Sequence, residues 1–379
     1  MMKASTNQSS IRGLSRNEAW MKQALERAWQ GRFRVSPNPL VGACLVRNHR
    51  LITEGFHAEY GADHAEVVAL KKAGKKTLGA TLYVTLEPCS TWGKTPPCIQ
   101  AILDAGIREV VIGALDPNPL HHGKGIAALR KAGVKVSFGI LAEEVKKQNE
   151  YFFKYARTGL PFVTLKMAQS LDGKIATREK KSRWITGKTA RNFVHALRAE
   201  QDAILVGRNT LLTDDPRLIP VGFEKKCRPE KPWRVVLDPR LEAPVSAKVF
   251  NEGPLTIRVI SEKILLQKRG KKDPLRGTLL PVPETKSGRL DLKILLKKLG
   301  TLGIAKLLVE GGGELAWSLL EARLVDQLIW ITAPKIIGGR SAVTSVEGSG
   351  FSDPNQALNL NIVRSEPLGE DWLFVAKPK

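Results

Sequence analysis

Short apolar runs alternate with helix-like segments through residues 17–155, and this alternation limits the possible folds more than any other feature of the chain. Strands are predicted at residues 41–46, 51–56, 81–86, 109–114 and 134–138, and helices at residues 17–30, 65–73, 126–132, 142–155 and in the segment that Cys98 opens. Strands that alternate with helices imply a sheet covered on both faces. We therefore predict an α/β fold.

One histidine and two cysteines stand at the ends of these predicted elements. His64 precedes a helix, Cys89 follows a strand, and Cys98 opens the next helix. Each alone is more typical of a surface pair or a small core residue. Together, one imidazole and two thiolates complete the protein ligands of a catalytic zinc, whose fourth position takes water. Glu66 then remains available as the proton carrier, which is the arrangement of zinc-dependent nucleobase deaminases.

The chemistry explains why these residue types are needed. Attack on the amine-bearing carbon of an aminopyrimidine requires hydroxide, and zinc lowers the pKa of its water from about 15.7 to roughly 7. Glu66 can pass the proton to the ring nitrogen and then to the departing ammonia. Because positions i and i+2 of a regular helix do not face each other, we expect His64 in the first turn of its helix.

Length and cysteine content set further limits. A chain of 379 residues is long enough for about two to three domains. No run approaches the roughly 20 apolar residues of a membrane span, and the tail, residues 1–15, lacks the apolar core of a secretory signal. Four cysteines, two of them assigned to zinc, indicate a reducing compartment, and we expect the cytoplasm. Cys44 is expected to be buried and Cys227 lies in a basic loop; neither receives a role.

The net charge of +23, from 60 basic and 37 acidic residues, has two interpretations. One is a nucleic-acid binder, and the other is a surface that favours phosphorylated small ligands. Basic and aromatic residues do not interleave as they do in a stacking platform. We therefore expect a phosphorylated small molecule as partner, with no nucleic acid and no membrane, and a homo-oligomer.

Two further polar residues are candidates for the first site. Asn38 lies between Pro37 and Pro39, which stiffen the loop on either side of it. It is either a reader of a pyrimidine edge or a turn residue. His57 ends the second predicted strand and can reach the same pocket.

A second domain follows residue 159. Strands are predicted at residues 162–165, 203–206, 234–237 and 306–309, helices at 189–199 and 314–321, and a polar loop at 211–216, while residues 241–290 receive no assignment. The last strand runs into Gly311-Gly312-Gly313 before a helix. This turn is either a phosphate cradle at a helix N-terminus or simply a tight turn, and it does not match the Rossmann fingerprint.

Several motifs of the first half resemble the pyrimidine deaminase of the riboflavin pathway. They are Pro37-Asn38-Pro39, His64-Ala65-Glu66, Glu87-Pro88-Cys89, Pro96-Pro97-Cys98 and Asp116-Pro117-Asn118-Pro119. Eight residues, Ser90 to Pro97, separate the cysteines, in contrast to the short P-C-x-x-C of other nucleobase deaminases. The resemblance implies that Glu66 is the catalytic carboxylate, that His64, Cys89 and Cys98 bind one zinc, and that Asn38 and His57 line the substrate pocket.

The second half resembles the reductase part of the bifunctional riboflavin biosynthesis protein family. The matching motifs are Lys166, Ser170 to Gly173, Trp184-Ile185-Thr186, Asp214-Asp215-Pro216, Glu310 to Gly313 and Pro334 to Gly339. The resemblance implies a cytidine-deaminase-like α/β/α sandwich over residues 16–158, after the tail, and a dihydrofolate-reductase-like α/β domain that uses NADPH over residues 159–379.

The same resemblance implies site residues in the second domain. Those expected to contact the cofactor are Ala168, Trp184, Thr210, Asp214, Gly312, Gly313, Glu314, Leu315, Ala316, Trp317 and Ser318. Those expected to line the substrate site are Ser182, Arg198, Leu218 and Glu310, with Lys166 and Glu310 polarising and protonating the sugar carbon that receives hydride. Val221 stands where relatives commonly carry an arginine for the substrate phosphate, and Arg217 or Arg198 is expected to supply that charge.

The implied activity is bifunctional. Zinc-dependent deamination of 2,5-diamino-6-(5-phosphoribosylamino)pyrimidin-4(3H)-one is followed by NADPH-dependent reduction of its ribosyl chain to ribityl. Two alternatives stay open. One is a single-activity deaminase with a degraded reductase site, which Val221 keeps possible. The other is a nucleic-acid deaminase with an RNA-binding appendage, which the net charge suits.

Overall fold

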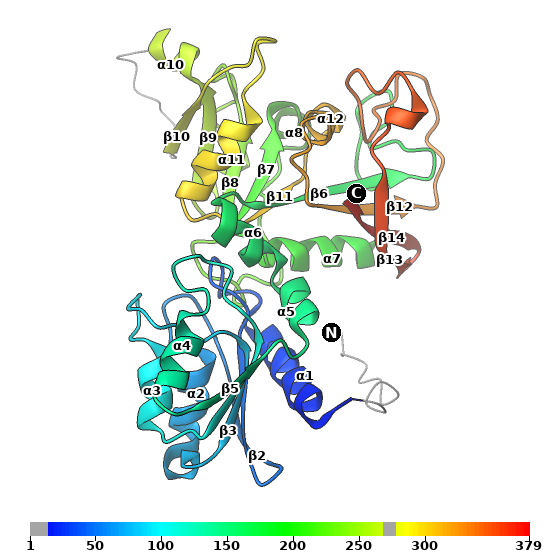
Figure 1. Ribbon diagram of the computed structural model, residues 1–379. Coiled ribbons are helices and arrows are strands. Elements are labelled where there is room, and N and C mark those ends of the chain that lie inside the picture. Colours follow the sequence, from blue (N-terminus) through cyan, green and yellow to red (C-terminus); the bar gives the residue numbers. More distant parts are fainter. Residues whose placement is uncertain (1–13, 268–277) are drawn as a thin grey trace. The chain divides into compact units, whose positions relative to one another are not determined.

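The computed structural model describes residues 14–267 and 278–379, and the chain divides into two compact units at Thr158 and Gly159 (Figure 1). Most of the expected tail, residues 1–13, lies outside this description, as do residues 268–277 of the unassigned region. Within the described ranges, every helix is too short or too polar to cross a bilayer.

The first unit is built on a sheet with strand order β2-β1-β3-β4-β5. Its strands are β1 (Gly42–Arg47), β2 (Arg50–Phe56), β3 (Thr81–Leu86), β4 (Glu109–Ala114) and β5 (Lys135–Phe138). Strand β1 runs antiparallel to β2 and β3, whereas β3, β4 and β5 are parallel. All five predicted strands are confirmed, and each boundary agrees to within one residue.

Two glycines allow helices to lie directly on the two faces of this sheet. The helices are α1 (Arg16–Ala28), α2 (Ala65–Ala73), α3 (Cys98–Asp104), α4 (Lys124–Lys131), α5 (Ala142–Gln148) and α6 (Glu150–Thr158), with 3-10 turns η2 (Trp29–Gly31) and η3 (Gly74–Thr77). A Cβ atom at Gly42 would lie 2.0 Å from the Ala24 oxygen of α1, and one at Gly55 would lie 2.2 Å from the Ala65 oxygen of α2. Because Gly42 and Gly55 point to opposite faces, both faces are covered, as the alternation predicted.

The prediction of one helix over residues 142–155 is wrong. The structure breaks it into α5 and α6 at Asn149, whose φ is −118°. The Asn149 side chain is fully buried, accepts a hydrogen bond from the Leu40 nitrogen at 2.7 Å, and donates one to the Leu40 oxygen at 3.0 Å. A side-chain amide that bonds to a distant backbone segment competes with the helix, and periodicity does not reveal this competition.

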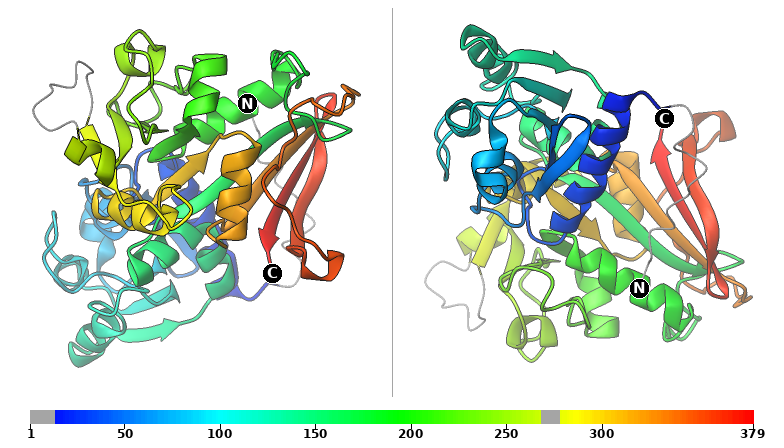
Figure 2. Two further views of the ribbon diagram at one scale, coloured as in Figure 1. Left: turned by 90° about the horizontal axis from the view of Figure 1, so that it is seen from above. Right: turned by 90° about the horizontal axis from the view of Figure 1, so that it is seen from below.

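The second unit contains a sheet with order β10-β9-β8-β7-β11-β6-β12-β14-β13. Its strands are β6 (Phe162–Ser170), β7 (Ala203–Gly207), β8 (Trp233–Leu237), β9 (Thr256–Ser261), β10 (Thr278–Val282), β11 (Lys306–Val309), β12 (Gln327–Ala333), β13 (Leu360–Leu368) and β14 (Asp371–Pro378). Pairing is parallel from β10 to β12, and β14 is antiparallel to both of its neighbours. These last strands, orange to red, lie side by side in Figure 2.

Helices connect these strands. They are α7 (Lys188–Ala199), α8 (Arg208–Asp214), α9 (Lys248–Asn251), α10 (Glu262–Gln267), α11 (Leu292–Thr301) and α12 (Gly313–Glu321), and a 3-10 turn, η4 (Pro354–Gln356), precedes β13. The apolar faces of α11 and α12 and the strand side chains from β6 to β12 form the main core. The predicted strands and helices of this domain are confirmed as elements, and α9, β9, α10 and β10 occupy the region that had no assignment.

Two boundary predictions in this unit are wrong. The strand predicted over residues 162–165 continues to Ser170, because β12 pairs with it from Thr164 to Ser170. The loop predicted over residues 211–216 is mostly the last turn of α8. Leu211, which is 1% exposed, anchors this helix in the core, and it ends at Asp215 with φ +40°. A distant strand and one buried side chain therefore override the local polar composition.

Candidate functional site

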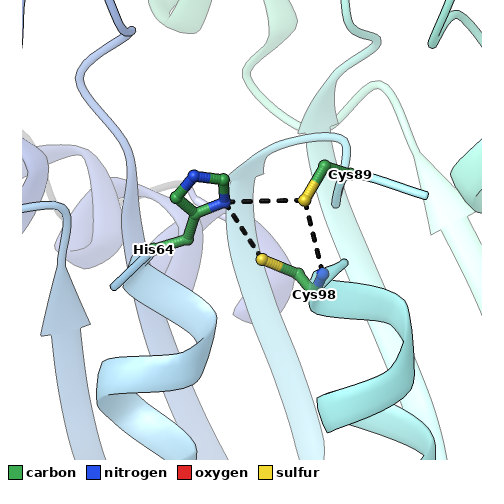
Figure 3. Close-up of side chains that lie close together, drawn as sticks. All are labelled: His64, Cys89 and Cys98. Atoms are coloured by element: carbon green, nitrogen blue, oxygen red, sulfur yellow. Dashed lines mark hydrogen bonds between the residues drawn. The ribbon is translucent and has the colours of Figure 1, made fainter. Parts of the chain in front are cut away.

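His64, Cys89 and Cys98 meet at one point in the first unit (Figure 3). His64 is the N-cap of α2, Cys89 follows β3, and Cys98 is the first residue of α3. The His64 Nδ1 atom lies 3.1 Å from Cys98 Sγ and 3.6 Å from Cys89 Sγ, and the three donor atoms lie within 4.8 Å of one another. The structure therefore brings the three predicted ligands together.

The donor set fits a tetrahedral metal. Bonds of about 2.3 Å to sulfur and about 2.0 Å to nitrogen at tetrahedral angles separate the two atoms by roughly 3.5 Å. The distance from His64 Nδ1 to Cys89 Sγ, 3.6 Å, is close to this value, and the distance to Cys98 Sγ, 3.1 Å, is shorter. Hydrogen bonds to Cys98 and His64 lower the pKa of the Cys89 thiol. A lower pKa favours the thiolate of Cys89, which is the form that binds metal, whereas the hydrogen bond to Cys89 and burial raise the pKa of the Cys98 thiol.

Glu66 lies beside this cluster in the first turn of α2. It is 3% exposed, and in the described part of the chain no hydrogen-bond partner reaches its Oε2 atom. Burial raises the pKa of this carboxyl, as expected for a carboxylate moved out of water. His64 has extended backbone angles (φ −72°, ψ 161°), so the pair escapes the i, i+2 restriction of a regular helix. The arrangement suits a group that takes up and releases a proton.

Asn38 and His57 lie next to each other at the same site. The Asn38 Nδ2 atom is 3.1 Å from His57 Nε2, and His57 Nδ1 is 3.1 Å from the Asp63 oxygen. The rings of His57 and His64 are 5.3 Å apart and meet edge to face. Burial lowers the pKa of His57 to about 4, so its ring is neutral at neutral pH. A neutral ring that donates to Asp63 accepts from Asn38, which fixes the orientation of both side chains.

A cavity of about 660 Å³ occupies the second unit, within the usual size range of ligand pockets. It opens at the carboxyl ends of β7 and β11, where ligands of parallel α/β sheets usually bind. The predicted residues that line it are Lys166, Ala168, Ser182, Trp184, Arg198, Thr210, Asp214, Leu218, Glu310 and Gly312. One cavity therefore collects the candidate catalytic residues with most of the predicted cofactor and substrate residues of this domain.

Three charged side chains, each 10–17% exposed, form a partly buried cluster in this cavity. Arg198 donates to Glu310 through Nε at 2.6 Å and through a terminal nitrogen at 2.8 Å, and Lys166 Nζ lies 4.0 Å from the same carboxylate. Burial alone would raise the pKa of Glu310, but Arg198 and Lys166 hold it at about 2. Burial lowers the pKa of Lys166, partly offset by Glu310. Glu310 is therefore ionised, and Lys166 gives up its proton more readily than a surface lysine.

The predicted cofactor residues from Gly312 to Ser318 do not all lie at the first cavity, because they form the N-cap and the first turns of α12, which point in different directions. Gly312 lines the first cavity, Ala316 and Trp317 are packed inside, and Glu314 is exposed. A Cβ atom at Gly313 would lie 2.6 Å from the Thr344 oxygen. Leu315 and Ser318 line a second cavity, of about 1320 Å³, which begins at the carboxyl end of β8. Five cations line it as well: Arg208, Arg240, Lys263, Arg289 and Lys293.

Val221 lines the first cavity. So do Arg198 and Arg217, the two residues expected to supply the positive charge that relatives carry at this position. Arg198 donates two hydrogen bonds to Glu310 and so is not available to the phosphate. Arg217 pairs with Glu252 at 2.8 Å, and both side chains are about half exposed, at 56% and 45%. An exposed pair of this kind contributes only about 0–1 kcal/mol. The structure therefore leaves Arg217 as the arginine that can change partner.

Three residues that belong to these sites were not predicted as site residues from the sequence. Arg191 and His195 line the first cavity from the same face of α7 as Arg198. Their i, i+4, i+7 spacing in a predicted amphipathic helix was the available signal. Glu87, directly before Pro88 and Cys89, is buried although it is charged. From the sequence it stood only within the motif Glu87-Pro88-Cys89, which gave it no role of its own.

Family models match both units of the chain. Residues 14–114 match the cytidine and deoxycytidylate deaminase zinc-binding region, and residues 161–374 match the RibD C-terminal domain. The two matches follow the order of the predicted domains, and the second covers more than half of the chain.

Relatives and solved structures extend this similarity to nearly the full length. The riboflavin biosynthesis protein RibD of Aquifex aeolicus is 42% identical over 97% of this chain and 99% of the relative. Acinetobacter baumannii RibD, form 1, superposes with a TM-score of 0.85 at 35% identity, covering 96% of this chain and 99% of that one. A Thermotoga maritima diaminohydroxyphosphoribosylaminopyrimidine deaminase/5-amino-6-(5-phosphoribosylamino)uracil reductase gives 0.84 at 37% identity, with the same coverage. The resemblance seen in the motifs is confirmed: the chain belongs to the RibD family of riboflavin biosynthesis proteins.

Proposed function

We propose that this chain is a bifunctional riboflavin biosynthesis enzyme with one active site in each unit. The first deaminates 2,5-diamino-6-(5-phosphoribosylamino)pyrimidin-4(3H)-one, and the second reduces the ribosyl chain of the product to ribityl. The cofactors are Zn²⁺ and NADPH. The observation that carries the proposal is the meeting of His64, Cys89 and Cys98 beside the buried Glu66. The deaminase and reductase named for the T. maritima relative support the order of activities.

In the first site, His64, Cys89 and Cys98 hold the zinc, which when bound supplies a Lewis acid that lowers the pKa of water to roughly 7. Glu66 takes a proton from the attacking water at its carboxylate and delivers it to the ring nitrogen. It then takes the second proton from the hydroxyl now on the carbon and delivers it to the exocyclic nitrogen, so that the carbonyl forms as the carbon–nitrogen bond breaks and ammonia leaves. Asn38 and His57, fixed by their mutual hydrogen bond, hold the pyrimidine edge.

In the second site, NADPH supplies the hydride and the protein positions the sugar against it. Lys166 holds a proton at Nζ for the sugar oxygen released when the carbon that receives hydride is reduced. Glu310 keeps Lys166 oriented and is itself fixed by two bonds from Arg198. All of the following residues line the cavity: we assign Ser182 and Leu218 to the substrate, and Ala168, Trp184, Thr210 and Asp214 to the nicotinamide.

We assign the deaminase to residues 16–158 and the reductase to residues 159–379, and we place the enzyme in the cytoplasm, where its four cysteines, none of which forms a disulfide, stay reduced. We also propose a homo-oligomer. Strand β13 is an edge of its sheet and exposes Leu360, Ile362 and Val363. An edge with exposed apolar side chains is suited to pairing with another chain.

The decisive experiment supplies the pyrimidine ribotide with NADPH and follows ammonia release and nicotinamide absorbance together. We expect one ammonia and one NADPH oxidised for each substrate molecule. Ammonia without NADPH oxidation would support the single-activity deaminase. Salt-sensitive RNA binding without use of NADPH would support the nucleic-acid deaminase.

We propose that NADPH spans both cavities of the second unit. Helix α8 contributes to both, with Thr210 lining the first cavity and Arg208 the second. Gly312, the N-cap of α12, lines the first, and Leu315 within α12 lines the second. With the nicotinamide in the first cavity, the adenosine end and its 2′-phosphate enter the second. Five cations and three carboxylates, Glu284, Asp291 and Glu321, line it, and Arg208 and Arg289 pair with Glu242 and Glu314. In this proposal the arginines exchange these carboxylates for the phosphate that NADH lacks.

Arg208→Gln is expected to raise KM for NADPH about tenfold and to leave KM for NADH unchanged. One charged hydrogen bond contributes about 1.5 kcal/mol, which corresponds to roughly a factor of ten. Steady-state kinetics with both cofactors measures the change. Lys286→Gln, at an exposed lysine outside the lining, is the matched control. Equal weakening of NADPH and NADH would contradict the assignment of the 2′-phosphate to this cavity.

Arg217→Ala is expected to raise KM for the reductase substrate about tenfold with little change in kcat. In the proposed complex, Arg217 leaves Glu252 for the substrate phosphate, an interaction of about 1.5–3 kcal/mol. Glu252→Gln is the matched control, because it removes the competing carboxylate and should leave KM unchanged or lower. If Arg217→Ala leaves KM unchanged, another cation binds the phosphate.

A further inference from the structure

Glu87 is a buried carboxylate that receives four backbone N–H groups. It follows β3 directly and is 5% exposed. Its Oε2 atom accepts from Asp116 N at 3.2 Å and Gly123 N at 3.0 Å, and its Oε1 atom accepts from Gly125 N at 3.0 Å and Ile126 N at 3.4 Å. All four donors belong to the segment that joins β4 to α4 or to the first turn of α4.

These bonds make Glu87 a cap for a helix far away in the sequence. The first N–H groups of a helix have no partner within the helix, and a negative charge there also matches the helix dipole. The N-cap residue of α4 is Gly123, which has no side chain to do this. Glu87 supplies the oxygens instead.

The capped helix lies directly on the peptide that leads to Cys89. A Cβ atom at Gly125 would lie 2.3 Å from the Pro88 oxygen, so only a glycine permits this approach. The segment before α4 also contacts the loop after Cys89, where Thr91 Oγ1 is 3.2 Å from His121 Nδ1. Cys89 is thus linked to α4 on both sides.

The opposite side of Cys89 is fixed by α3. Cys98 N donates to Cys89 Sγ at 3.3 Å, and Ile99 N donates to the Cys89 oxygen at 3.3 Å. Helix α3 therefore fixes where the sulfur lies relative to Cys98. Glu87 and α4 fix where the whole turn lies relative to the sheet, and hence relative to His64.

We propose that Glu87 is a positioning residue for metal binding: by capping α4 against Pro88, it holds Cys89 at the place where its sulfur meets His64 and Cys98. This inference rests on the proposed role of Cys89 as a zinc ligand. Residues that support a metal ligand typically affect metal affinity by about 10- to 100-fold.

The test is Glu87→Gln in the full-length protein. Glutamine keeps the shape but replaces one acceptor oxygen with an NH₂ group, which opposes the backbone donors. We expect zinc release to a chelator to be about 10- to 100-fold faster. We also expect a changed visible absorption of the Co²⁺-substituted protein, since that spectrum reports ligand geometry. Reductase activity should stay unchanged.

Leu129→Ala is the matched control, because it removes buried packing from α4 but keeps all four bonds to Glu87. It should lower the thermal midpoint without changing the cobalt spectrum. Glu87→Asp keeps the charge but withdraws it by one methylene, and it should give an intermediate release rate even if Glu87→Gln does not fold.

A structural role alone predicts lower stability with the wild-type cobalt spectrum and zinc release rate in both Glu87 variants, and that result would overturn the proposal. A wild-type protein that binds neither zinc nor cobalt would instead remove the proposed zinc site itself. The two failures are therefore distinguishable.

Discussion

Glu66→Gln is expected to lower kcat for ammonia release by about 10²- to 10⁴-fold, the usual contribution of a positioned acid–base group. Glutamine has nearly the same shape but neither accepts nor delivers the proton. The carboxylate is buried beside the cluster and is not one of its three donors, so zinc content should stay at one per chain. Ammonia release and metal analysis on the same preparation measure both quantities.

The matched control is Glu59→Gln, which removes an exposed carboxylate paired with Arg34 at 3.2 Å. It should leave deaminase turnover unchanged. Reductase activity of the Glu66 variant should equal that of wild type. Unaltered ammonia release by Glu66→Gln would show that another group carries the proton, and loss of zinc would show that Glu66 contributes to metal binding.

Glu310→Gln is expected to abolish NADPH oxidation and to lower the free energy of unfolding of the second unit by about 3–5 kcal/mol. Removing this carboxylate leaves Arg198 and Lys166 buried without their common counter-charge. Chemical denaturation gives the stability change, and nicotinamide absorbance with the pyrimidine substrate gives the activity. Glu366→Gln, which breaks an exposed pair with Arg364, should cost less than about 1 kcal/mol.

The stability difference has a defined pH dependence. The pKa of Glu310 falls from its ordinary 4.5 to about 2, because Arg198 and Lys166 outweigh the effect of burial. A depressed pKa contributes stability that is complete above the unfolded-state value and is lost as pH falls through the folded-state value. The gap between wild type and Glu310→Gln should therefore be constant near neutral pH and shrink from about pH 4.5 towards pH 2. A gap that is independent of pH over this range would contradict the ionised state of Glu310.

Local patterns were sufficient for most of the first site. Cys89 and Cys98 stand at the ends of elements that periodicity and proline predict, and His64, expected in the first turn of its helix, is the N-cap directly before that turn. The bounds predicted for β3 and β4 were correct and those for β1 were shifted by one residue, because the apolar residues of each strand are buried. Where neighbouring residues determine the local structure, the sequence was sufficient to predict the elements and the positions of the site residues on them.

Non-local contacts account for what the sequence did not reveal. Glu87 is separated from its four donors by 29 to 39 positions, and nothing near Glu87 indicates that a helix needs its oxygens. The cofactor segment shows a different difficulty. A motif marks consecutive residues, but a helix turns them to different sides, so Ala316 and Trp317 face the interior while Leu315 and Ser318 face a cavity.

The close packing at Gly55 means that a substitution can abolish deaminase activity without altering a metal ligand or the proton carrier. This glycine carries no donor or charge from a side chain, yet its Cα atom lies against the turn of α2 that follows His64 and contains Glu66. An added methyl group would push that turn away from the sheet and carry a ligand and the proton carrier with it. A mutation at Gly55 can thus inactivate the deaminase although this residue is neither a metal ligand nor a catalytic group. The reductase on the same polypeptide would remain active.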